Sequence, residues 1–83
     1  MDTIKQGQII ALVESYKGVN VSYCHVGDEY VTMRTEGLKK SLFPFAAKKI
    51  LTGVSGIKFV YILFGAQVWV YSVNTLKYGG YVK

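Results

Sequence analysis

Residues 59–73 read FVYILFGAQVWVYSV, an apolar stretch with Gly65 near its middle. The stretch is shorter than the roughly 20 apolar residues of a membrane-spanning helix. It is also rich in the β-branched and aromatic side chains typical of strands. Glycine at the first central position suits a tight type II′ turn. We therefore expect two antiparallel strands, residues 57–64 and 67–73, joined at Gly65-Ala66, and no membrane segment.

The turn at Gly65 sets the register of this hairpin, because a two-residue loop leaves one way to pair the strands. The expected cross-strand pairs are Ile62 with Trp69, Val60 with Tyr71, and Tyr61 with Val70. Both faces of the hairpin are then apolar. Such a hairpin is expected to be covered on both sides or to lie at an interface between protein chains.

Glycines and charged residues divide the N-terminal half into three further apolar stretches, which predicts strands over residues 8–16, 19–26 and 30–35. A three-residue loop, residues 27–29, would place the apolar sets of the second and third strands on one side of the sheet. The outward face would then hold Asn20, Ser22, Cys24, Tyr30, Thr32 and Arg34.

A helix is expected before the last hairpin. Ser41 is its candidate N-cap, Pro44 is acceptable only in its first turn, and Gly53 ends it. Phe45 falls on the outward half of the helical wheel, between Lys48 and Lys49. The half that should pack on the sheet consists of Leu42, Phe43, Ala46, Ala47, Ile50 and Leu51.

The expected element order is βββαββ in one domain of 83 residues. This order predicts a mainly β (α+β) fold, a small antiparallel barrel or curled sheet that is OB-fold-like or SH3-like, with the helix packed on the sheet. A helix on an open antiparallel sheet would have the same order. Residues 1–7 and 76–83 are expected to be loose termini, unless the second segment adds a short edge strand.

The composition of the chain narrows the classes of partner that it is expected to bind. Ten Lys and Arg against five Asp and Glu give a formal charge of +5. This excess favours anionic partners such as nucleic acid, although it is also common in small soluble domains. The one cysteine, Cys24, cannot form an internal disulfide, no Cys/His spacing suits zinc, and the N-terminus does not resemble a signal peptide. We expect a cytoplasmic protein with no metal or cofactor.

Groups suited to catalysis are sparse. The adjacent carboxylates of residues 28–29 are typical of a solvated turn, and the adjacent Cys24 and His25 would point to opposite faces of a strand. A metal-free site for RNA cleavage would need His25, Tyr30 and Arg34 to converge with a lysine. We therefore expect a binding protein rather than an enzyme.

Basic residues interleaved with aromatic ones give the first expectation for a partner. Aromatic rings stack on bases with ~1–3 kcal/mol per base, and lysine and arginine pair with phosphates. The ordinary alternative is that the rings are cross-strand or loop contacts and the lysines are a solvated helix face. The sequence predicts single-stranded nucleic acid, DNA or RNA, bound by Tyr30, Arg34, Lys39, Lys40, Phe45, Lys48 and Lys49.

The second expectation is a protein-interaction or inhibitor module, of the kind that viruses and mobile elements encode. Seven tyrosines and a hydrophobic content of 51% suit a protein interface. Tyr61, Trp69 and Tyr71 would then contact an acidic protein surface or a second copy of the chain in a homodimer. The sequence does not decide between the two expectations.

Overall fold

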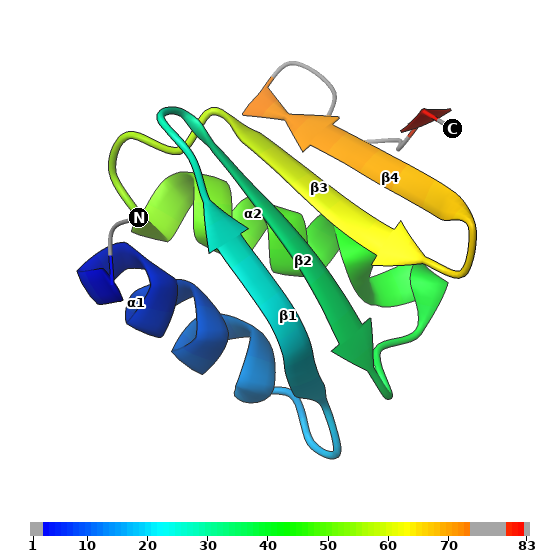
Figure 1. Ribbon diagram of the computed structural model, residues 1–83. Coiled ribbons are helices and arrows are strands. Elements are labelled where there is room, and N and C mark those ends of the chain that lie inside the picture. The colour runs from blue at the N-terminus through cyan, green and yellow to red at the C-terminus, as the bar shows by residue number, and fades with distance from the viewer. Residues whose placement is uncertain (1–2, 74–79, 83) are drawn as a thin grey trace.

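The computed structural model describes residues 3–73 and 80–82. Its strands form one five-stranded sheet in the order β1-β2-β3-β4-β5, and both helices lie on one face of it (Figure 1). The fold is α+β. The elements in chain order are α1 (Thr3–Glu14), β1 (Asn20–Val26), β2 (Tyr30–Glu36), the short 3-10 helix η1 (Lys40–Leu42), α2 (Phe43–Gly53), β3 (Phe59–Phe64), β4 (Gln67–Ser72) and β5 (Gly80–Val82).

The sheet is mixed and open. β1 with β2, β3 with β4, and β4 with β5 are antiparallel pairs, whereas β2 and β3 run parallel. Parallel neighbours need a long crossover between them, and α2 provides it. β1 and β5 lie at the two edges, so the sheet does not close into the expected OB-fold-like or SH3-like barrel.

The first element corrects the expected order βββαββ, because most of the segment 8–16 is helical and belongs to α1. Ile9 and Val13 are fully buried, and Leu12 and Tyr16 pack beside them. Residues spaced by three, four and seven share one face of a helix, so this face can cover the sheet. The short apolar stretch suggested a strand, but packing against the sheet favours the helix.

Residues 27–29 separate β1 from β2, as expected, but the two strands do not pair in the expected register beside them. Val26 pairs with Val31, and the Gly27 N–H donates a hydrogen bond of 2.8 Å to the Tyr30 carbonyl. Beside the loop, the register is therefore the one that the pattern of apolar residues disfavoured. The expected register was based on the assumption that the first of these two strands, β1, is uninterrupted.

A β-bulge between Val21 and Tyr23 interrupts β1 and leaves Ser22 without a cross-strand partner in the ladder. The bulge shifts the alternation of side chains by one residue. Val21 and Cys24 therefore both pack against the core, although they are three residues apart. Tyr23 and His25 take the outward positions that were expected for Ser22 and Cys24.

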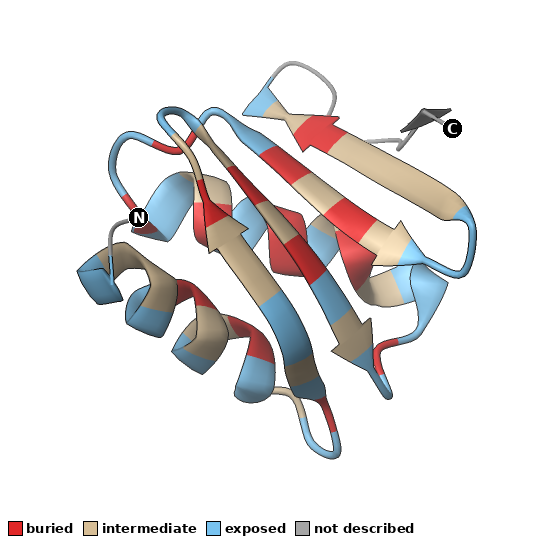
Figure 2. Cartoon of the chain, viewed as in Figure 1, coloured by how far each residue is buried: buried red, intermediate tan, exposed pale blue. Residues whose placement is uncertain are grey.

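The β3–β4 hairpin is confirmed, including its turn at Gly65, which has a φ of 60°. The observed register contains the expected pairs Val60–Tyr71, Tyr61–Val70 and Ile62–Trp69. Buried residues alternate with more exposed ones along β2 and β3 (Figure 2). The hairpin is thus covered by helices on one face only.

Helix α2 matches the expected span and its buried face. Pro44 lies in its first turn and Gly53 is its last residue. The N-cap position is held by Leu42 without a side-chain hydrogen bond, so the assignment of Ser41 as the cap was wrong. The residues of α2 that are buried against the sheet are Phe43, Ala46, Ala47 and Ile50.

The chain ends differ in part from expectation. Residues 3–7 are helical, so this part of the N-terminus is not loose. β5 pairs with β4 and confirms the short edge strand, while residues 76–79 and 83 lie outside the described residues. Within the described ranges, no helix is long and apolar enough to cross a membrane.

Candidate functional site

The residues expected to bind nucleic acid fall on opposite sides of the sheet. Tyr30 and Arg34 lie on β2, on the face away from the helices. The other five residues belong to the helix layer, where they precede or lie in η1 and α2: Lys39, Lys40, Phe45, Lys48 and Lys49. The single basic and aromatic surface that the sequence suggested is therefore divided into two.

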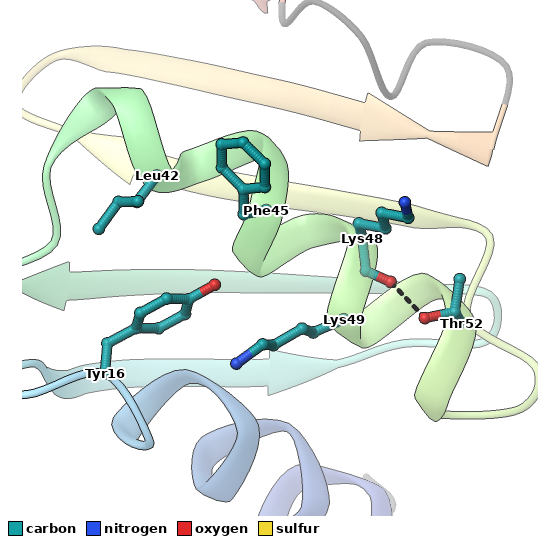
Figure 3. A pocket seen from close by; sticks show the side chains of 6 residues that line it. All are labelled: Tyr16, Leu42, Phe45, Lys48, Lys49 and Thr52. Atoms are coloured by element: carbon teal, nitrogen blue, oxygen red, sulfur yellow. Dashed lines mark hydrogen bonds between the residues drawn. The ribbon is translucent and has the colours of Figure 1, made fainter.

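A groove lies between the segment that follows α1 and the outer side of α2 (Figure 3). Its volume of about 540 Å³ is in the range of ligand clefts, roughly 300–1,000 Å³. We name it the helix groove, and its lining residues are Tyr16, Leu42, Phe45, Lys48, Lys49 and Thr52. The lining thus combines two aromatic rings with two ammonium groups, and none of these six side chains is acidic.

Lys49 connects the two walls of the helix groove. Its Nζ lies 4.4 Å from the centroid of the Tyr16 ring and 3.5 Å from Oγ of Ser15. A cation over an aromatic face gains about 0.5–1 kcal/mol at an exposed site. These contacts orient the Tyr16 ring beside α2, as Figure 3 shows.

Phe45 and Lys48 form the outer part of the same groove. The Phe45 side chain is 60% exposed, whereas Ala46 and Ala47 beside it are buried. Lys48 lies three residues later and therefore on the same side of α2. Thr52 Oγ1 donates a hydrogen bond of 2.7 Å to the Lys48 carbonyl, which does not engage the Lys48 ammonium (Figure 3). An exposed ring and a lysine thus adjoin each other in solvent.

Lys40 has different neighbours from the lysines of the groove. Its Nζ lies 4.9 Å from the centroid of the Phe64 ring and 5.8 Å from that of Trp69. Lys40 is thus held against the β3–β4 hairpin, and Lys39 beside it is exposed. Both lysines can add positive field to the helix layer, but neither lines the groove.

The open face of the sheet, which is the face away from the helices, carries the other expected residues. The Tyr30 ring lies 5.8 Å from the Tyr61 ring and 6.0 Å from the His25 ring, measured between centroids. A shallow depression of about 360 Å³ lies beside these rings. The described side chains of the open face are Asn20, Tyr23, His25, Tyr30, Thr32, Arg34, Glu36, Phe59, Tyr61, Leu63, Val68, Val70 and Ser72.

Arg34 and Glu36 are the charged members of this set, and both are exposed. Nη2 of Arg34 donates a long hydrogen bond of 3.5 Å to the carbonyl of Gly65. Towards β4, the face becomes aliphatic, with Leu63, Val68 and Val70 in neighbouring positions. The open face therefore has rings but little net charge.

The three expected interface residues do not share a surface. Tyr61 lies on the open face, whereas Trp69 and Tyr71 point toward the helices. The Trp69 ring lies 6.3 Å from that of Phe43, and Tyr71 is 2% exposed. Burial raises the pKa of the Tyr71 hydroxyl. Tyr71 is thus a core residue, and its assignment as an exposed interface position was wrong.

Cys24 and His25 point to opposite faces of β1, as the alternation of a strand predicts. Burial raises the pKa of the Cys24 thiol, which makes the thiolate scarcer. Among the described residues, no three His, Cys, Asp or Glu side chains gather where they could hold a metal ion.

Tyr16 is the aromatic residue of the groove that sequence reasoning missed; Leu42 and Thr52 were also not among the expected site residues. Tyr16 was placed at the end of a strand, which separated it from Phe45 and the lysines. The spacing of Ile9, Val13 and Tyr16 by four and three residues is the helical signal that could have found it.

Comparison of the chain with protein-family models, with curated proteins and with solved structures gives no match.

Proposed function

We propose that this chain is a non-enzymatic binding protein whose helix groove takes single-stranded nucleic acid. The observation that carries the proposal is the exposed Phe45 ring beside Lys48, in a groove whose other wall is Tyr16. A large exposed ring loses hydrophobic free energy unless a partner covers it. The two lysines favour a partner that is anionic.

The chemistry of the groove suits a base and its phosphates. A base can stack on the Phe45 or Tyr16 ring, while Lys48 and Lys49 pair with the phosphates on either side. Stacking needs an unpaired base, because the faces of duplex bases are already covered by their neighbours. This supports a single strand over a duplex, and recognition with little dependence on sequence.

The same lysines would also attract an acidic protein surface, which is the competing partner. An acidic protein surface would pair with the two lysines of the groove, but its binding would not need the aromatic rings of Phe45 and Tyr16. Competition by polyglutamate therefore separates the two partners, because it would displace a partner bound by charge alone more readily than one that also stacks. A cytoplasmic location belongs to this proposal and rests on the sequence alone.

The test is fluorescence anisotropy of a labelled single strand and of a matched duplex, titrated with the protein at about 50 and 200 mM salt. For six phosphate contacts, binding weakens roughly a thousandfold between these salt concentrations. We expect a smaller loss, roughly tenfold, because the groove presents two lysines. The single strand should bind more tightly than the duplex.

A pair of variants locates the contact. Lys48→Gln and Arg34→Gln each remove one positive charge, but from opposite sides of the sheet. Lys48→Gln should weaken binding and reduce the slope of log K against log salt by about one unit, while Arg34→Gln should leave both nearly unchanged. Equal losses of affinity from both variants would contradict binding in the helix groove. No binding at the lower salt concentration would reject the proposal.

A further inference from the structure

The open face of the sheet is an apolar surface that nucleic-acid binding in the helix groove does not use. Two of its side chains are large and well exposed, Tyr23 at 50% and Phe59 at 41%. The rings of Tyr30 and Tyr61 are partly exposed between them. Soluble proteins seldom leave such a face without a partner.

The part of this face towards β4 favours a protein partner over a nucleic acid. Leu63, Val68 and Val70 are aliphatic and offer no flat surface for a base. Arg34 and Glu36 are the charged groups among the described side chains of the open face, and their charges are opposite. The lysines of η1 and α2 lie on the other side of the sheet, so little positive field serves phosphates here.

The distribution of charge also favours a second copy of the chain. Two chains that each carry a formal charge of +5 repel one another least where charge is sparse. That place is the open face, whereas the helix layer carries Lys39, Lys40, Lys48 and Lys49. A different, acidic partner would gain little on a face where Glu36 accompanies Arg34.

The area of the face is sufficient for a small dimer interface. β1 to β4 have six or seven residues each and are about 20 Å long, and four such strands spaced by about 4.8 Å give roughly 380 Å² of flat sheet. The relief of the side chains raises the total for two copies to about 1,000 Å², which is the lower limit for a specific interface. We therefore expect a dimer that dissociates on dilution.

We propose that this protein forms a symmetric homodimer in which the open faces of two sheets pack against each other. Sheets packed in this way lie about 10 Å apart with interdigitating side chains. The helices are then the outer layers, and the two helix grooves face away from each other. One short single strand could therefore occupy only one groove. The dimer does not depend on the function proposed for the groove.

Sedimentation velocity of the full chain, from about 5 to 500 µM at 150 mM salt, tests the dimer. We expect the weight-average mass to rise from 9.3 kDa toward twice that value. Phe59→Lys places a charge on the open face and should weaken association at least tenfold. Phe45→Lys is the matched control, because it makes the same change on the helix layer, and it should leave association unchanged.

Circular dichroism and thermal unfolding establish that each variant is folded. Tyr23→Lys, at an exposed ring of the open face, is a second variant with a low risk to the fold. A monomer at every concentration would overturn the proposal and would indicate that a different protein, rather than a second copy of the chain, covers the open face. A dimer that Phe45→Lys disrupts and Phe59→Lys does not would also overturn it.

Discussion

The Lys49 ammonium lies 4.4 Å from the centre of the Tyr16 ring, and this contact joins α2 to the segment after α1. The two residues are 33 positions apart in the sequence (49 − 16 = 33), so only the packing of the two helices brings them together. The contact forms one end of the helix groove and gives that groove its mixture of ring and charge.

This contact should be measurable as a coupling free energy. A double-mutant cycle with Lys49→Met and Tyr16→Leu, followed by urea unfolding, should give about 0.5–1 kcal/mol of coupling. The control is a second cycle in which Lys48→Met takes the place of Lys49→Met. The coupling between Lys48 and Tyr16 should be close to zero. Equal coupling for both lysines would indicate a general charge effect rather than the contact seen.

Phe45→Ala should separate binding from stability. The ring is 60% exposed, so its loss should change the free energy of unfolding by no more than about 0.5 kcal/mol. Loss of one stacking surface should weaken single-strand affinity by about 1–3 kcal/mol, or about 5- to 150-fold. Anisotropy and urea unfolding measure the two quantities on the same sample. A large loss of stability with no loss of affinity would show that the ring is structural.

Gly37→Ala should destabilise the fold. Gly37 has a φ of +86°, and an added Cβ would collide with the Gly18 carbonyl oxygen. The left-handed backbone alone costs about 1–2 kcal/mol for a residue with a side chain, so the loss of unfolding free energy should be at least that large. Urea unfolding gives the value.

Gly7→Ala is the matched control, with the opposite sign. Gly7 lies within α1, and an added Cβ there meets no atom within 4 Å. Alanine in an open helical position should add roughly 0.5–1 kcal/mol of stability. If Gly7→Ala were as harmful as Gly37→Ala, the helical assignment of this segment would be wrong.

The Cys24 thiol should react slowly in the folded protein. Burial raises its pKa above the usual 9.0, so less thiolate is present at pH 8 than in the unfolded chain. Alkylation by iodoacetamide, followed by mass spectrometry, should be slower in buffer than in urea. Because the raised pKa belongs to the folded state, its contribution to stability is present below pH 9.0 and is lost as the pH rises through the folded pKa. Cys24→Ser should remove this part of the pH dependence, and a native rate equal to that in urea would contradict the burial.

The last hairpin and α2 could be predicted because their signals are local. Gly65 sets the turn, the turn sets the pairing of Ile62 with Trp69, and Pro44 and Gly53 bound the helix. The outward position of Phe45 followed from helical periodicity for the same reason. None of these inferences required knowledge of what packs against the hairpin or the helix.

Two errors came from features that depend on distant contacts. The segment from residue 8 to residue 16 is apolar on more than one side, so its own pattern allows a strand or a helix, and packing of Ile9 and Val13 against the sheet selects the helix. The bulge in β1 breaks strict alternation, and it exists because Val21 and Cys24 can then both face the core.

The sequence by itself determined the local elements of the second half, the positive charge, and the outward placement of Phe45 with Lys48 and Lys49. Tertiary structure alone decided that Tyr16 joins them, that Tyr71 is buried, and which face of the sheet stays open. The physical reason is that turns and periodicity act over a few residues. Which of two apolar faces is covered depends instead on where the helices pack, and a segment's own sequence does not contain that information.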